Sequence, residues 1–114
     1  MKIRHIVKKH DFTAVFEGKK TVGNFFALYT RRDVKDEDVF SVGVVVAKKS
    51  APKAVARNYI RRRIYAYFRD KKMFLKGGSS VIFRLRKDIR GVKRKELGRI
   101  IPEELSALSM KAKI

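Results

Sequence analysis

The chain has 114 residues, 45% of them hydrophobic, so a single folded domain with its own core is expected. Thirty Lys and Arg residues against eleven Asp and Glu residues give a formal charge of +19, and self-repulsion at that charge destabilises a compact protein. The absence of cysteine excludes disulfides and cysteine-bound zinc. No apolar run approaches the roughly 20 residues that span a bilayer, and the first residues lack the apolar segment of a secretory signal. We therefore expect a cytoplasmic protein that binds nucleic acid, with an anionic membrane surface as the second candidate partner.

The first third of the chain predicts an arm, a short helix and a strand. Residues 1–10 are basic and weakly patterned, which indicates an extended arm. Phe12, Val15 and Phe16 follow at i, i+3 and i+4, the spacing of one face of a short helix that Asp11 caps. The next stretch, "NFFALYT", alternates like a strand with two apolar faces. One face carries Phe26 and Leu28, and the other carries Phe25, Ala27 and Tyr29.

Two further strands flank a long helix. "FSVGVVVA" is β-branched and uncharged, as expected of a strand buried on both faces. A helix then runs from the region of Pro52 to about Arg69, or as far as Leu75. "SVIFRLR" alternates as a third strand. The last stretch is helical by composition, but Gly98 and Pro102 predict a broken or short helix.

This order predicts an α+β fold, a single-domain α/β sandwich whose mixed sheet has about four strands. The long helix lies between two strands that we expect to be parallel neighbours. Crossovers of that kind are right-handed by default. We see no internal repeat and no linker that would separate domains.

The long helix carries the strongest functional signal. Residues 48–72, "KKSAPKAVARNYIRRRIYAYFRDKK", hold ten basic side chains and one acid, Asp70. Ile60, Ile64 and Phe68 form an apolar stripe at helical spacing. Because acids are missing, i, i+4 ion pairs cannot neutralise the basic face, which favours a nucleic-acid surface over an ordinary solvated helix. Arginine suits bidentate contact with phosphate, and Asn58 in mid-helix indicates a polar contact outside the helix.

The aromatic residues near the N-terminus have two interpretations. Phe12 and Phe16 at i, i+4 are usual for a hydrophobic core. Together with one face of the following strand, they are also suited to floor a groove in which unpaired bases stack, at roughly 1–3 kcal/mol per base. His5 and His10 make a poor metal pair, and we find no catalytic arrangement of nucleophile, base or phosphate loop. Any reaction therefore draws its chemistry from another molecule.

The segment "AKKSAPKAVARNYIRRRIYAYFR" resembles the signature helix of the bacterial ribonuclease P protein component. "HDFTAVFEGKK" is similar to that family's first helix, and "FALYT" and "SVGVVVAKK" to its strands. The resemblance implies a protein that binds a catalytic RNA and the 5′ leader of precursor tRNA. In that family the RNA holds the active site, and Mg²⁺ held mainly by RNA and substrate activates water. The implied fold resembles a ribosomal protein domain, with a left-handed crossover through the signature helix.

The resemblance and the basic stretch together name two sets of site residues, with no catalytic residue and no metal ligand in the protein. The RNA-binding set is Lys48, Lys49, Lys53, Arg57, Asn58, Arg61, Arg62 and Arg69. The leader-binding set is Phe12, Phe16, Phe25, Ala27 and Tyr29. The sequence departs from the family pattern at four positions: Tyr65 replaces a common Arg, Arg63 replaces an apolar residue, and Gly98 and Pro102 interrupt a helix.

Two other classes of protein stay open at this point. A structural RNA-binding protein, such as a ribosomal protein, would bury the leader-binding aromatics in its core. A membrane-surface binder would need large apolar residues free to insert into lipid. The apolar stripe of the basic helix is better used against the sheet, which ranks the membrane binder last.

Overall fold

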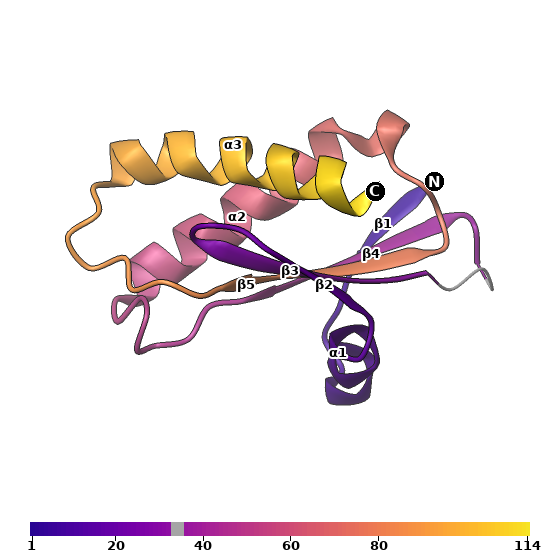
Figure 1. Cartoon of the computed structure of the whole chain (residues 1–114), viewed down its shortest axis with the longest axis horizontal. Helices are drawn as coiled ribbons and strands as arrows, with labels where there is room; N and C mark the ends of the chain where they lie inside the picture. The colour runs from indigo at the N-terminus through magenta and orange to yellow at the C-terminus, as the bar shows by residue number, and fades with distance from the viewer. Residues whose placement is uncertain (33–35) are drawn as a thin grey trace.

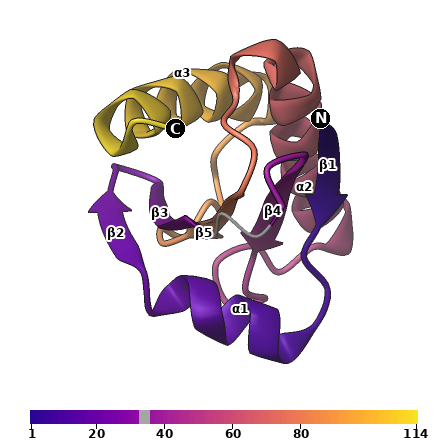
Figure 2. The same cartoon turned by 90° about the vertical axis from the view of Figure 1, so that its right-hand side faces the viewer.

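A computed structural model describes residues 1–32 and 36–114 and contains one mixed sheet between two layers of helix (Figure 1). Helices α2 and α3 cover one face of the sheet, and α1 covers part of the other (Figure 2). The elements in chain order are β1 (Lys2–His5), α1 (Lys9–Phe16), β2 (Lys19–Val22), β3 (Phe26–Arg32), β4 (Val39–Val45), α2 (Ala54–Asp70), the 3-10 turn η1 (Lys72–Phe74), β5 (Ser79–Leu85) and α3 (Arg94–Ala112).

The sheet has the strand order β1-β4-β5-β3-β2. Strand β4 pairs in parallel with β1 and with β5, whereas β3 pairs antiparallel with β5 and β2. The expected parallel neighbours on either side of the long helix are therefore confirmed. In Figure 2, β4 and β5 run away from the viewer, β5 lies to the left of β4, and α2 returns above the sheet. This crossover is left-handed, as the family resemblance implies and against the general preference.

The structure adds three details to the predicted elements. The arm at residues 1–10 is not free, because Lys2–His5 forms an edge strand paired with β4 and α1 begins at Lys9. Among the described residues the sheet has five strands where about four were expected, since both short basic segments at its edges, β1 and β2, join it. The last helix is unbroken over Arg94–Ala112, although Pro102 lies inside it.

A contact between α2 and α3 explains why Pro102 is tolerated. Proline has no N–H, so it leaves the Gly98 carbonyl, four residues earlier, without its helical donor. The Arg63 guanidinium of α2 donates to that carbonyl at 3.1 Å. A side chain at position 98 would meet the Tyr59 hydroxyl at 3.0 Å, so glycine allows α3 to approach α2 closely. Arg63, Gly98 and Pro102, which all depart from the family pattern, thus belong to one interhelical contact.

The main core lies between the sheet and the pair α2 and α3. Ile60, Ile64 and Phe68 of α2 are fully buried there, which confirms the predicted apolar stripe. The Phe68 ring lies 5.5 Å from the rings of both Phe40 and Phe83, in tilted pairs. Aromatic pairs of this geometry stabilise a core beyond the burial of their area. Because its back is anchored to the sheet, α2 turns its basic side outward.

Candidate nucleic-acid interface

The outward face of α2 presents the predicted basic residues to solvent. Asn58, Arg62 and Arg69 are exposed, and Arg61 is half-buried. Lys48 and Lys49 are exposed in the turn before the helix, where the Ala47 carbonyl accepts hydrogen bonds from the Ser50 and Ala51 amides. Lys53 is exposed at the N-cap position, immediately before the first residue of the helix. The structure therefore brings all eight members of the RNA-binding set to one helix and the turn that leads into it.

Arg57 differs from the other arginines of this set because it is bonded within the protein. Its Nη1 donates to the carbonyls of Ala51 and Pro52 at 2.9 and 2.8 Å. The guanidinium thereby ties the first turn of α2 to the segment that carries Lys53. An arginine has five N–H donors, so three remain available to a ligand when Nη1 uses both of its own.

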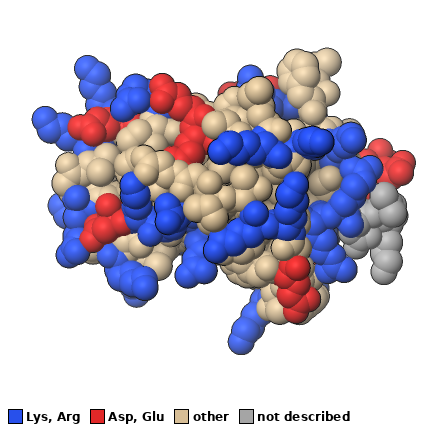
Figure 3. Space-filling model, viewed as in Figure 1, with Lys and Arg blue, Asp and Glu red and all other residues tan. Residues whose placement is uncertain are grey.

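No acidic side chain forms an ion pair with α2 in the described part of the chain. The ion pairs found there join Arg90 to Asp88 and Arg99 to Glu103, and the His10 ring also contacts the Asp11 carboxylate, all outside the helix. The arginine face is thus not tied up by carboxylates. The cationic excess also continues elsewhere: Figure 3 shows Lys and Arg side chains along the whole length of one molecular face, with Asp and Glu in small groups.

Tyr65, where the family commonly has arginine, stacks on a histidine. The His5 ring of β1 lies 3.8 Å from the Tyr65 ring with 16° between their planes. Burial raises the pKa of the Tyr65 hydroxyl above its ordinary value, and the charge of Arg61 opposes part of that shift. The stack places a flat aromatic surface beside the arginines of α2. No local pattern indicates this contact, because only the pairing of β1 with β4 brings residue 5 next to residue 65.

Four of the five predicted leader-binding residues lie together where α1 packs against the sheet. Ala27 and Tyr29 of β3 are buried there, and Phe12 and Phe16 of α1 are half-buried. The Phe16 ring meets the Tyr29 ring edge-to-face at 4.7 Å, and the Lys20 ammonium lies 5.6 Å from the centre of the Tyr29 ring. A part of each α1 aromatic therefore remains accessible, which is intermediate between a closed core and an open groove.

Phe25 does not join this cluster. It lies before the first residue of β3 and packs against the main core on the opposite side of the sheet. The Glu104 carboxylate of α3 accepts the amide protons of Phe25 and Phe26 at 2.7 and 2.8 Å, which fixes the turn. Period-2 alternation fails at Phe25 because the strand has not yet begun.

The structure adds two cations to this sheet face that the sequence does not assign to the site. The register pairs Ala27 with Arg84 and Tyr29 with Lys20, so both basic residues flank the aromatic cluster and both are exposed. The alternation of "SVIFRLR" already placed Arg84 on the face of Ile82. What the sequence did not show is that this face adjoins α1. Sheet register, rather than residue type, thus assigns Arg84 to the site.

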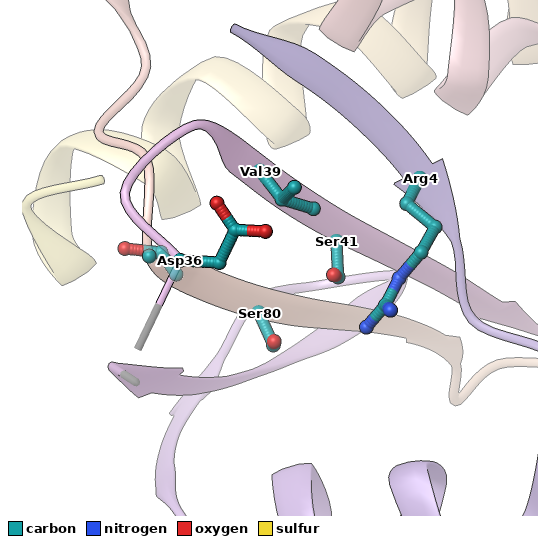
Figure 4. A pocket seen from close by; sticks show the side chains of 7 residues that line it. Arg4, Asp36, Val39, Ser41 and Ser80 are labelled. Atoms are coloured by element: carbon teal, nitrogen blue, oxygen red, sulfur yellow. The ribbon is translucent and has the colours of Figure 1, made fainter. Parts of the chain in front are cut away.

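A hollow of about 110 Å³ lies further along this sheet face (Figure 4). The Arg4 side chain extends from β1 over the surface that carries Ser41 and Ser80, and the Asp36 carboxylate points into the same hollow. Its charges are mixed, so it is less suited to a polyanion than α2.

Within residues 1–32 and 36–114, no group of three His, Cys, Asp or Glu side chains is placed to hold a metal ion. No helix in the described ranges has the length and apolarity needed to cross a membrane.

The fold and the arginine surface define a small, basic α+β protein of the RNA-binding class. Comparison with known proteins makes this specific: the family model described as Ribonuclease P matches residues 1–110. The chain belongs to the ribonuclease P family, and its relatives are protein components of that family. The resemblance seen in the sequence is therefore confirmed.

Curated relatives named ribonuclease P protein component agree with this assignment. One from a Marinomonas species is 30% identical over 114 residues, covering 96% of this chain and 83% of the relative. One from Bacillus cereus is 33% identical over 99 residues, covering 85% and 84%. One from Chromobacterium violaceum is 36% identical over 78 residues, and the matched part spans only 63% of that relative's length.

Solved structures share the fold. The RNase P protein of Staphylococcus aureus superposes with a TM-score of 0.84 at 26% identity, covering 99% of this chain and 98% of that one. The RNase P protein of Thermotoga maritima gives 0.75 at 25% identity, covering 94% and 96%. The mixed sheet packed with helices is thus the fold of bacterial RNase P proteins.

Proposed function

We propose that this chain binds the catalytic RNA of ribonuclease P and the 5′ leader of precursor tRNA, and assists removal of the leader. The observation that carries the proposal is the outward face of α2, where arginines stand without carboxylate partners among the described residues while Ile60, Ile64 and Phe68 anchor the helix to the core. Such a face gains counterion-release free energy when it lies along phosphates.

The two predicted surfaces have separate tasks in this proposal. The RNA-binding set, Arg57 included, contacts the catalytic RNA. The half-buried rings of Phe12 and Phe16, with Tyr29 and Ala27 beneath them, receive unpaired leader bases, and the neighbouring Lys20 and Arg84 receive leader phosphates.

Cleavage chemistry is assigned to the RNA subunit in this proposal. Mg²⁺ bound by RNA and substrate would activate water for phosphodiester hydrolysis. The described side chains form no cluster suited to a metal ion, so we assign no protein ligand to it. The protein contributes binding and orientation of the precursor.

A reconstitution assay tests the proposal. The protein is mixed with a bacterial ribonuclease P RNA and precursor tRNA at low magnesium, and the 5′ end of the product is mapped. Correct cleavage above the rate of RNA alone is expected, and a polylysine of similar charge serves as the control for non-specific charge screening. Tight RNA binding without faster cleavage would instead identify a plain structural RNA-binding protein.

A further inference from the structure

A hollow of about 510 Å³ on the outward side of α2 combines residues of three elements. Its basic lining consists of four arginines, and its remaining lining consists of aromatic rings and one alanine. No Asp or Glu of the described residues lines it. The lining residues are Arg62, Arg63, Arg69 and Arg94, with His5, Tyr59, Tyr65 and Ala66.

Arg94 enters this hollow from α3, outside the signature helix. The centre of its guanidinium lies 4.5 Å from the centre of the Tyr59 ring, in a cation–π contact. The bond from Arg63 to the Gly98 carbonyl fixes the first turns of α3 against α2. Arg94 is the first residue of α3, so this docking sets its position.

The residues that line the hollow favour the binding of an anion. Like charges gathered without counter-charges destabilise the free protein, and a bound phosphate group removes that penalty. Arginine binds phosphate oxygens through paired N–H donors, and the flat stack of His5 on Tyr65 forms one side of the same hollow.

We propose that this hollow binds a backbone phosphate of the RNA and that Arg94 is one of its contact residues. The inference rests on the proposed function, because it takes the RNA subunit as the ligand. It extends the RNA-binding surface from α2 to the start of α3, and it gives Arg63 the role of a positioning residue for Arg94.

The test measures the affinity for a bacterial ribonuclease P RNA between 50 and 200 mM salt. For Arg94→Gln, the slope of log K against log salt should fall by about 0.7 to 0.9, the loss expected for one phosphate contact. At 0.1 M salt this corresponds to roughly five- to eightfold weaker binding. Arg94→Lys should keep the wild-type slope, because it keeps the charge.

Lys111→Gln is the matched control, since Lys111 is an exposed cation in the last turn of the same helix. Its slope should stay at the wild-type value, and thermal melts should show that all variants are folded. A wild-type slope for Arg94→Gln, or equal losses for both glutamine variants, overturns the site while the proposed function stands. A slope that falls in Arg94→Lys as well overturns the charge contact, since packing on Tyr59 would then explain the loss. Failure of the wild-type protein to bind the RNA overturns the proposed function itself.

Discussion

Arg57 and Arg62 belong to the same basic motif, yet the structure gives them different surroundings. The Arg57 guanidinium is bonded to the Ala51 and Pro52 carbonyls, whereas Arg62 is exposed and has no hydrogen bond to other described residues. Residue type alone made them equivalent. The tertiary contacts make Arg57 a structural residue as well as a candidate for RNA contact.

Replacing each arginine by methionine separates the two roles, since methionine keeps much of the stem and removes the donors. Arg57→Met should lower the free energy of unfolding by about 1–2 kcal/mol, because two hydrogen bonds to the turn before α2 are lost. Arg62→Met should leave that free energy unchanged and weaken RNA binding. Urea unfolding and RNA titration of both variants check this. Equal stability losses in the two variants would contradict the assignment.

Phe16→Leu probes the leader site at the scale of one ring. Leucine keeps the contact with the sheet largely filled but removes the accessible ring face. Precursor tRNA should bind the reconstituted enzyme about 5- to 150-fold more weakly, as expected for one lost stack of 1–3 kcal/mol, and mature tRNA should bind as before.

Phe74→Leu is the control for this experiment, because Phe74 lies in η1 and is 79% exposed. This substitution should change the binding of neither precursor tRNA nor mature tRNA. If Phe16→Leu weakens precursor and mature tRNA equally, Phe16 is not a leader contact.

At the scale of elements, α3 shows how a helix keeps its continuity across a proline. Pro102 removes a donor from the ladder of α3, and Arg63 supplies one from α2. Gly98 and Pro102 predict a break in the helix when the α3 segment is considered alone. An external donor for the freed carbonyl was not foreseeable without knowing that α2 lies alongside.

A double-mutant cycle tests this exchange of donors. Arg63→Met should cost roughly 1 kcal/mol of unfolding free energy in the wild-type background, since a hydrogen bond to the Gly98 carbonyl is lost. In a Pro102→Ala background it should cost much less, because the backbone amide that this substitution restores now donates to that carbonyl. The two substitutions should therefore couple by about 0.5 to 1 kcal/mol in urea unfolding. Additive effects would show that Arg63 does not replace the helical donor.

At the scale of the whole molecule, the charge of +19 opposes folding and favours RNA binding. The ion pairs between described residues are exposed and lie outside α2, so they do little to offset the repulsion among its arginines. The protein is thus organised for a polyanionic partner rather than for its own stability.

Added salt should accordingly have opposite effects on the protein and on its complex. Raising sodium chloride from about 20 to about 200 mM should raise the Tm of the free protein, because screening weakens self-repulsion. The same change should weaken RNA binding steeply, with a slope of about −6 if roughly eight phosphates are contacted at about −0.7 each. A Tm that falls with salt would show that attractive charge pairs dominate the folded state.

The sequence by itself determined the long helices, the three central strands, the buried stripe of α2 and the family, because helical and strand periodicities and the Arg57-Asn58 motif are local patterns. Tertiary structure alone decided that residues 2–5 form an edge strand, that Phe25 faces the main core, and that Arg63, Arg84 and Arg94 acquire distinct surroundings. Those outcomes depend on strand register and helix docking, which join residues far apart in the chain. No local pattern of side chains encodes such pairings, since each forms only when the two distant segments fit one another.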